Sequence, residues 1–368
     1  MDKKDHKLLY VPGPIEVKED VREVCAKPMI GHRTGDFRKL YASIKPKLKK
    51  LLYTENAVMV STSSGSGFME AAMRNLVGKK VLNCINGAFS KKWYDIAVAC
   101  GKPAEKLEVE WGKAIKPDMI DAKLKTGGFD AVCVTHNETS TGVMNNLGEI
   151  SEVVKRYPDV MFLVDAVSSM SGAKIEVDKL GIDMCLASSQ KAFALPPGIA
   201  VASVSERAFK KAQTIQGRGY YFDLVELKKA YDKDETPYTP AVSLMYGLDY
   251  QLDKFFKEGL DARWERHKRL AKTTREWAKR MGFQIFPEPG YESVTVTCIV
   301  DTKGMDLKKM QEMMGEKGFS VDKGYRKLNE DLVAKGKKST FRIPHMGDTT
   351  DGDLSDLLKA FEEVIKTL

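Results

Sequence analysis

Four apolar residues run directly into a carboxylate in Met161-Phe162-Leu163-Val164-Asp165. Helical patterns separate this segment from other short, mostly apolar runs along the chain: residues 57–60, 80–85, 131–134, 184–187 and 199–204. Runs that are buried on both faces and alternate with helices are typical of a mostly parallel sheet wrapped by helices. The sequence therefore predicts an α/β fold. Ligands of such sheets bind at the carboxyl ends of the strands, so the residues that follow each run are the candidates for chemistry.

The pattern changes in the last third of the chain. From Ala241 to about Met281 it is helical and charged, with a break near Gly259. Strand-like and helical stretches follow, over residues 283–286, 294–300, 306–316 and 340–343, and Thr350 with Asp353 forms a capping-box pattern for a last helix. A chain of 368 residues with 43% apolar content can fill two unequal domains. We predict an N-terminal arm (1–17), a large domain (18–258) and a small α+β domain (259–368).

Composition argues against several other classes of protein. The formal net charge of +8 is spread over the chain and mixed with 51 acidic residues, and its densest basic run, residues 45–50, is expected to be a solvated helix face. No nucleic-acid-binding signature accompanies the charge, so no nucleic-acid partner is expected. The charged start and the lack of a long apolar run predict a soluble, cytoplasmic protein without a membrane segment.

The cysteines are scattered and form no C-x-x-C motif. They are Cys25, Cys84, Cys100, Cys133, Cys185 and Cys298. Most of them stand in apolar stretches, which predicts buried thiols rather than disulfides or metal ligands.

A loop rich in serine and glycine follows the first apolar run. Residues 61–67 read Ser-Thr-Ser-Ser-Gly-Ser-Gly and lead into an amphipathic helix. Small residues let the backbone approach an anion, hydroxyls donate hydrogen bonds, and a helix N-terminus adds free N–H groups, so the loop suits a phosphate. A flexible turn is the alternative. Glu70 replaces the third glycine of a dinucleotide fingerprint, and no G-x-x-x-x-G-K-[ST] occurs in the chain.

Asp165 stands at the carboxyl end of a buried strand pattern. A carboxylate in such a place is costly unless a cation or strong donors meet it. Taken alone, Asp165 could be a helix N-cap, a metal ligand or a cofactor contact. No metal is expected, because the chain has only five histidines and none is spaced with a carboxylate in a metal-binding pattern.

Lys191 ends Ser188-Ser189-Gln190-Lys191, directly after another apolar run. This segment matches S-x-x-K, and Lys125-Thr126-Gly127 supplies a K-T-G. The order of the two motifs is reversed and S-D-N is missing, so the match is coincidental. A phosphate loop, a buried acid and a lysine at one sheet edge are what pyridoxal phosphate needs, since it has a phosphate, a ring nitrogen to keep protonated and an aldehyde that forms a Schiff base. A free lysine is uncharged in only about one molecule in 2500 at pH 7, so Lys191 must be sheltered.

These motifs resemble those of the class V, fold-type-I aminotransferases, in the alanine–glyoxylate and serine–glyoxylate (serine–pyruvate) group. The resemblance extends from Pro12-Gly13-Pro14 and Gly31-His32-Arg33 to Phe341-Arg342-Ile343. It implies a role for each matching residue: Ser64, Gly65, Ser66 and Gln190 on the cofactor phosphate, Phe89 stacked on the ring, Thr139 on the ring hydroxyl, Asp165 on the ring nitrogen, Lys191 as the Schiff-base lysine, Thr239 reaching the phosphate from the neighbouring subunit, and Gly13 and Arg342 on the substrate.

The resemblance implies a transaminase that moves an amino group from alanine or serine to glyoxylate or pyruvate by a ping-pong mechanism, in a homodimer with shared active sites. Aspartate or ureidoglycine as the amino donor stays open. A cysteine-desulfurase-type lyase is disfavoured, because it needs a reactive cysteine on a mobile loop and Cys298, the only cysteine in the last third, lies in a strand pattern. A non-catalytic binding protein is the alternative from another class.

Overall fold

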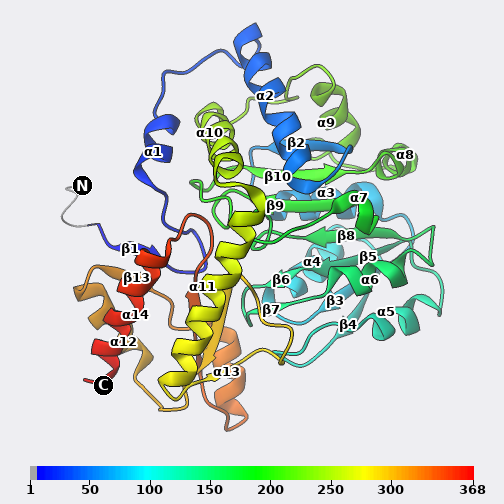
Figure 1. The fold of residues 1–368 in the computed structure, drawn as a ribbon. Coiled ribbons are helices and arrows are strands. Elements are labelled where there is room, and N and C mark those ends of the chain that lie inside the picture. The colour runs from blue at the N-terminus through cyan, green and yellow to red at the C-terminus, as the bar shows by residue number, and fades with distance from the viewer. Residues whose placement is uncertain (1–5) are drawn as a thin grey trace.

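A computed structural model describes residues 6–368 (Figure 1). Its central element is a seven-stranded sheet in which β10 is antiparallel to both of its neighbours and all other pairs are parallel. In spatial order the strands are β2 (Ala57–Ser61), β10 (Ala200–Val204), β9 (Met184–Ser188), β8 (Met161–Asp165), β5 (Ala131–Thr135), β3 (Val81–Ile85) and β4 (Ala104–Glu108). The predicted mostly parallel α/β sheet is confirmed. Only β4 was not predicted, because this edge strand is half-exposed and reads Ala-Glu-Lys-Leu-Glu.

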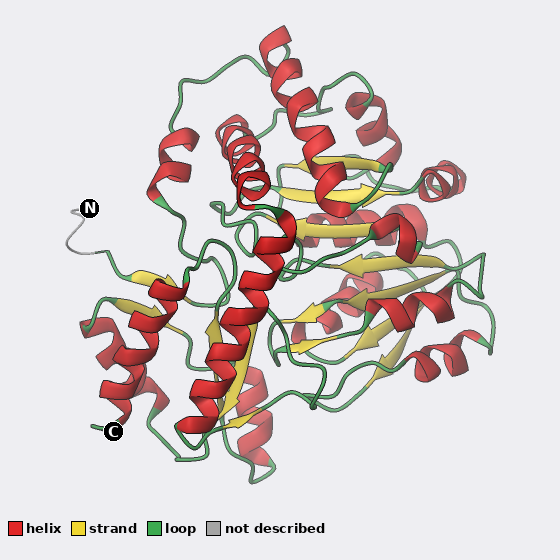
Figure 2. Ribbon diagram, in the orientation of Figure 1, coloured by secondary structure: helices red, strands yellow, loops and turns green. Residues whose placement is uncertain are grey.

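Helices lie on both faces of this sheet (Figure 2). The helices of this part of the chain are α1 (Glu19–Cys25), which packs on α10, and α2 (Gly35–Leu52), α3 (Gly65–Leu76), α4 (Ala88–Ala99), α5 (Pro117–Leu124), α6 (Leu147–Val154), α7 (Val177–Leu180), α8 (Glu206–Thr214), α9 (Leu224–Tyr231) and α10 (Val242–Glu258). A short hairpin of β6 (Asn137–Glu138) and β7 (Val143–Met144) follows β5. Phe68, Met73 and Leu76 of α3 are fully buried in the main hydrophobic core, so the helix that follows the Ser/Gly loop is fixed firmly against the sheet.

The rest of the chain forms a smaller unit with its own core. Its three-stranded antiparallel sheet contains β11 (Gln284–Ile285), β12 (Val296–Val300) and β14 (Thr340–Pro344). Its helices are α11 (Leu260–Arg280), α12 (Leu307–Glu316), α13 (Arg326–Ala334) and α14 (Asp351–Ile365). Trp277, Phe341 and Phe361 are central to the second core. The capping box of Thr350 and Asp353 is present at the start of α14.

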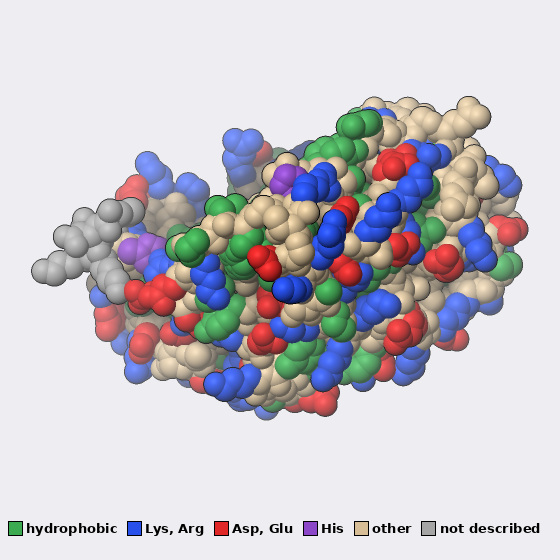
Figure 3. Space-filling view, turned by 90° about the horizontal axis from the view of Figure 1, so that it is seen from above, with side chains coloured by type: hydrophobic (Ala, Val, Ile, Leu, Met, Phe, Trp, Pro, Cys, Tyr) green, Lys and Arg blue, Asp and Glu red, His purple; other side chains and the backbone are tan. Residues whose placement is uncertain are grey.

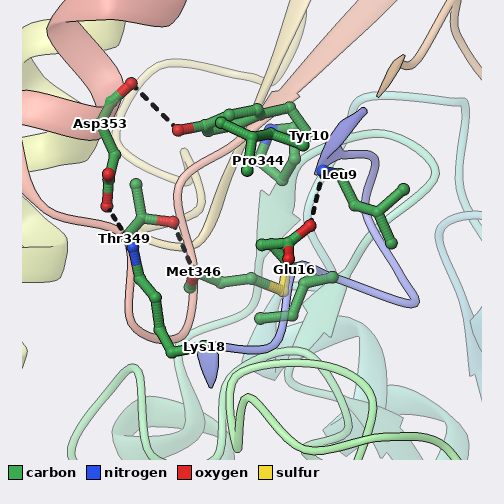
Figure 4. Close-up of a pocket in the computed structure, with 10 residues that line it drawn as sticks. Leu9, Tyr10, Glu16, Lys18, Pro344, Met346, Thr349 and Asp353 are labelled. Carbon is green, nitrogen blue, oxygen red and sulfur yellow. Dashed lines mark hydrogen bonds and ion pairs between the residues drawn. The ribbon is translucent and has the colours of Figure 1, made fainter. Parts of the chain in front are cut away.

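The N-terminal segment packs on this smaller unit. Strand β1 (Leu8–Tyr10) pairs in parallel with β13 (Phe319–Val321), a contact between the two ends of the chain. Figure 4 shows how the segment is held: the Tyr10 hydroxyl donates to the Asp353 carbonyl oxygen at 3.0 Å, and Lys18 Nζ lies 2.9 Å from an Asp353 carboxylate oxygen. The segment then turns toward the edge of the large sheet.

The break near Gly259 separates α10 from α11, and Gly259 has a left-handed φ of 87°. Phe255 before the break belongs to the main core and Leu270 after it to the second core. The domain boundary at 258/259 agrees with this change and stays a prediction, as do the limits of the N-terminal arm. Long helix α11, yellow in Figure 1, runs beside both units.

Two expectations from composition need correction. Cys84, Cys133, Cys185 and Cys298 are buried, but Cys25 and Cys100 are only half-buried, because they stand at helix ends. The basic run on α2 is not simply solvated, since Lys45 and Lys47 form ion pairs with Asp234 and Asp249.

Acidic and basic side chains are interspersed over the face seen in Figure 3. Among residues 6–368, no helix combines the length and apolar character needed to cross a bilayer. The absence of a nucleic-acid partner and the cytoplasmic location stay predictions.

Candidate active site

A cavity of about 160 Å³ lies at the carboxyl edge of the large sheet. Eight of the eleven predicted site residues line it: Ser64, Gly65, Ser66, Phe89, Thr139, Asp165, Gln190 and Lys191. They lie at the carboxyl end of β8 or in the segments that follow β2, β3, β5 and β9. The parallel arrangement of these strands therefore brings together residues that lie up to 127 positions apart in the sequence (191 − 64).

The Ser/Gly loop forms the start of α3. Ser64 is the N-cap residue, but its side chain makes no capping hydrogen bond. Close packing requires the glycines, since a Cβ on Gly65 would lie 2.8 Å from Val167 Cγ2 and one on Gly67 would lie 2.6 Å from the Phe222 ring. Free backbone N–H groups and serine hydroxyls at the start of a twelve-residue helix make an anion site.

Lys92 on α4 also lines the cavity, and the sequence analysis missed it. Its Nζ lies 3.4 Å from Ser66 Oγ and 5.8 Å from the centroid of the Phe89 ring. The available signal was its helical spacing, since Lys92 follows Phe89 by three residues and projects from the same side of the helix. It adds a positive charge beside the serine hydroxyls.

Asp165 ends β8 and is 3% exposed. One carboxylate oxygen accepts a hydrogen bond from the Val167 N–H at 2.8 Å. The pKa of Asp165 is raised to about 7, mainly by burial and in smaller part by Glu138, while the Val167 N–H, Lys92 and Lys191 act in the opposite direction. The N-cap alternative does not hold, because the next helix begins only at Val177. The site therefore favours a positive charge or a donor next to this carboxyl group.

Lys191 follows β9 and lines the same cavity as Asp165 and Phe89. Burial lowers the pKa of Lys191 to about 8, and the nearby Arg342 guanidinium also lowers it. Its Nζ donates to the Pro12 carbonyl oxygen and lies 5.7 Å from the centroid of the Phe89 ring. Gly13 lies directly on this side chain, since a Cβ there would be 2.6 Å from Lys191 Cδ. The N-terminal segment thus covers the lysine.

Several buried polar atoms in the cavity wall have no hydrogen-bond partner within the described part of the chain. They include both amide atoms of Asn137 and the Ser188 hydroxyl. Buried polar groups without partners are rare in folded proteins. A polar ligand in the cavity would satisfy these atoms, so the residues present fit a cofactor with hydrogen-bonding substituents. The sequence analysis missed Asn137, although it precedes Thr139 by two residues, the spacing of one strand face.

Buried Glu138 is a further residue that the sequence analysis missed. Its carboxylate accepts hydrogen bonds from the backbone N–H groups of Phe89 and Ser90 at 3.1 and 2.7 Å. These groups belong to the first turn of α4, where a negative charge is favourable. Glu138 therefore holds the helix end that carries the Phe89 ring.

Arg342 on β14 comes from the smaller unit and does not line the cavity itself. Its guanidinium donates to the Thr139 carbonyl oxygen at 2.9 Å and to both carboxylate oxygens of Asp322 at 2.8 Å. Tyr325 lies between the two units, with its ring 6.1 Å from that of Phe89 and 5.8 Å from the Arg342 guanidinium. Arg342 thus lies against the cavity wall, which it contacts through Thr139.

Thr239 is not brought to this cavity within one chain. It lines a separate hollow together with Thr62, Tyr221 and Tyr238. The neighbouring Tyr220 is 81% exposed, and its ring lies 5.4 Å from that of Tyr238.

An anion-binding loop, a sheltered lysine and a buried carboxyl group around one cavity are the features of an α/β enzyme with a phosphorylated cofactor. The family model of class V aminotransferases matches residues 18–357, so the chain belongs to this family. This confirms the aminotransferase class, the fold-type-I architecture and pyridoxal phosphate as the cofactor.

Three similar proteins agree with this assignment. The chain is 40% identical to an uncharacterised aminotransferase of Methanocaldococcus jannaschii, over 98% of this chain and 93% of the relative. It is 33% identical to a serine–glyoxylate aminotransferase of Methylorubrum extorquens, over 93% and 87% of the two chains. The solved structure of an alanine–glyoxylate aminotransferase from Nostoc sp. superposes with a TM-score of 0.91 at 26% identity, covering 98% of this chain and 95% of that one.

Proposed function

We propose that this aminotransferase transfers the amino group of a small amino acid, alanine or serine, to glyoxylate or pyruvate. The observation that carries the proposal is the position of Arg342 beside a cavity that contains Lys191 and Asp165. One guanidinium next to the reacting lysine suits the single carboxylate that small amino acids and 2-oxo acids share. The names of the serine–glyoxylate and alanine–glyoxylate relatives support the same substrates.

The cofactor-binding roles are also proposed residue by residue. Ser64, Gly65, Ser66 and Gln190, with Lys92, hold the phosphate; Phe89 stacks on the ring, Thr139 contacts its hydroxyl group, and Asp165 keeps its nitrogen protonated. Bound pyridoxal phosphate supplies an electron-accepting ring that acidifies the Cα–H of an amino acid. Ser168 supports Thr139, because the two hydroxyls lie 2.6 Å apart.

Lys191 is proposed to hold the cofactor covalently and to carry the proton of the substrate Cα. With a pKa of about 8, its amine is neutral in roughly one molecule in ten at pH 7, which is far more often than a free lysine. Pro12 and Gly13 shelter it from water. Gly13 is also proposed to contact the substrate beside Lys191, and any larger residue there would meet the Lys191 side chain.

The desulfurase alternative gains no support from the cysteines. Cys298 lies in β12, is fully buried, and has its thiol pKa raised to about 12 by burial. A thiol of this kind is not a nucleophile at neutral pH. Aspartate and ureidoglycine remain the alternative donors.

Steady-state kinetics with a panel of donors tests the proposed function. Alanine, serine, aspartate and ureidoglycine are each paired with glyoxylate, pyruvate and 2-oxoglutarate. We expect the highest kcat/KM with alanine or serine and glyoxylate or pyruvate, and parallel double-reciprocal lines, since the amino group passes through the enzyme between two half-reactions. A preference for a dicarboxylate donor or acceptor would overturn the substrate assignment, and intersecting lines would overturn the ping-pong order.

We also propose a homodimer in which Thr239 completes the phosphate site of the neighbouring subunit. The exposed aromatic side chains beside Thr239 support an interface there: Tyr220 is 81% exposed and Tyr221 is 40% exposed.

Thr239→Ala is therefore expected to weaken cofactor binding about tenfold, which is the typical effect of losing one hydrogen bond to a charged group. Equilibrium dialysis of pyridoxal phosphate measures this change, and Thr214→Ala, on the exposed end of α8, is the matched control. Dilution of the wild type below its dimer dissociation constant is expected to release cofactor as well. A monomer that retains full cofactor affinity would refute the shared site.

A further inference from the structure

The Arg342 guanidinium donates hydrogen bonds to other residues of the protein. Its Nε and Nη2 donate to the two carboxylate oxygens of Asp322, each at 2.8 Å, and Nη1 donates to the Thr139 carbonyl oxygen at 2.9 Å. The side chains of Arg342 and Asp322 are 7% and 16% exposed. The guanidinium is therefore fixed from two sides in a largely buried place.

Asp322 is held as firmly as the arginine. The two residues form a cross-strand bridge between the end of β13 and β14, so their side chains leave neighbouring backbones. Asp322 also accepts a hydrogen bond from the Gly324 N–H at 2.8 Å. Gly324, with φ 95°, packs so closely on β14 that an added Cβ would lie 2.0 Å from the Thr340 carbonyl oxygen. These contacts hold the backbone of Asp322 against β14, next to Arg342.

These contacts leave two N–H donors of Arg342 unused. A guanidinium has five N–H donors. Three of them are used by Asp322 and Thr139, and one remains on each of Nη1 and Nη2. Two donors are what a carboxylate takes up in a bidentate contact.

We propose that Asp322 is a positioning residue that fixes Arg342 so that its remaining N–H groups face the carboxylate of the substrate. This inference rests on the proposed role of Arg342 in substrate binding. Thr139 links the clamp to the cofactor site, because its carbonyl oxygen accepts from Arg342 while its side chain lines the cavity. Asp322 thereby sets where the carboxylate lies relative to the cofactor.

Asp322→Asn tests this role, since it keeps the shape of the side chain and removes one acceptor and the charge. We expect the KM values for alanine and pyruvate to rise about 10- to 100-fold, the effect expected when hydrogen bonds to a charged group are lost. The kcat is expected to stay within about threefold, because a contact made in both ground and transition states affects binding alone. Asp351→Asn is the matched control, because Asp351 forms a similar two-bond pair with Arg269 on the surface.

Three further measurements separate positioning from a general structural role. The reaction with ethylamine, which is alanine without its carboxylate, is expected to be unchanged in Asp322→Asn. The dissociation constant for acetate, a carboxylate that does not turn over, is expected to rise by the same factor as KM. In an Arg342→Ala background, Asp322→Asn is expected to have no further effect on KM, because the two residues act as one unit.

Asp322→Glu is a second variant, needed if the neutral variant does not fold. It keeps the charge but displaces the guanidinium, so the same two KM values are expected to rise. A lower KM in either variant would show that Asp322 competes with the substrate, and an unchanged KM would show that it does not position Arg342; each overturns the inference. A wild type that is inactive with every donor would instead refute the proposed function.

Discussion

Lys191→Ala is expected to lower transamination by roughly 10⁴-fold or more, because one amine is proposed both to hold the cofactor and to carry the Cα proton. General base catalysis alone typically contributes about 10²–10⁴-fold, and loss of the covalent attachment adds to this. The Ser/Gly loop, Phe89 and Asp165 remain in the variant, so non-covalent cofactor binding is expected to persist. Rates of the alanine half-reaction under single turnover measure the effect.

Lys179→Ala is the matched control for this variant, since Lys179 is 75% exposed and lies on α7, outside the cavity. Added small amines are expected to restore part of the lost proton transfer in Lys191→Ala. Turnover near the wild-type rate in the absence of such amines would remove Lys191 from the mechanism.

Asp165→Asn is expected to lower kcat/KM by roughly 30- to 5000-fold, which corresponds to the loss of about 2–5 kcal/mol when one partner of a buried charge pair is removed. Asparagine is neutral, so it cannot stabilise the protonated ring nitrogen with a negative charge. Asn fills nearly the same space as Asp, so the shape of the cavity is expected to be retained. Normal activity of this variant would show that Asp165 is not the residue that keeps the ring nitrogen protonated.

Asp165→Asn is also expected to raise the free energy of unfolding of the cofactor-free protein, by an amount that depends on pH. Because burial raises the pKa of Asp165 from 3.8 to about 7, the folded protein holds an extra proton between these values, and stability falls as the pH rises through this window. The full penalty, about 4 kcal/mol, is present above pH 7.

Urea unfolding of the cofactor-free proteins at pH 8 and pH 5 measures this effect. Asp165→Asn is expected to be more stable than the wild type at pH 8, while the difference is expected to shrink toward pH 5, where Asp165 is protonated. An equal difference at both pH values would contradict the proposed environment of this carboxyl group.

The central sheet, and the residues that meet at its carboxyl edge, were predictable because they depend on local sequence. Six strands are short apolar runs that are buried on both faces, and the residues after them meet wherever the strands are parallel. The family resemblance then supplied the role of each matching residue. Strand β4 escaped prediction because none of its five residues is buried, so it lacks the apolar run of a central strand.

The missed features depend on contacts between distant parts of the chain. The pairing of β1 with β13 joins residues more than 300 positions apart, and no periodicity in either segment encodes it. Asp322 and Glu138 likewise have no motif of their own. Their importance arises from Arg342 and from the first turn of α4, which only the tertiary structure brings next to them.

The central claim is that Lys191 carries the cofactor, and borohydride reduction tests it most directly. Borohydride adds hydride to the carbon–nitrogen double bond between the cofactor and its lysine, and this makes the attachment permanent. After reduction and proteolysis of the wild type, peptide mass spectrometry is expected to find the cofactor mass on the peptide that contains Lys191, and reduced Lys191→Ala is expected to carry no label. Cofactor attached to any other lysine of the wild type would contradict the account.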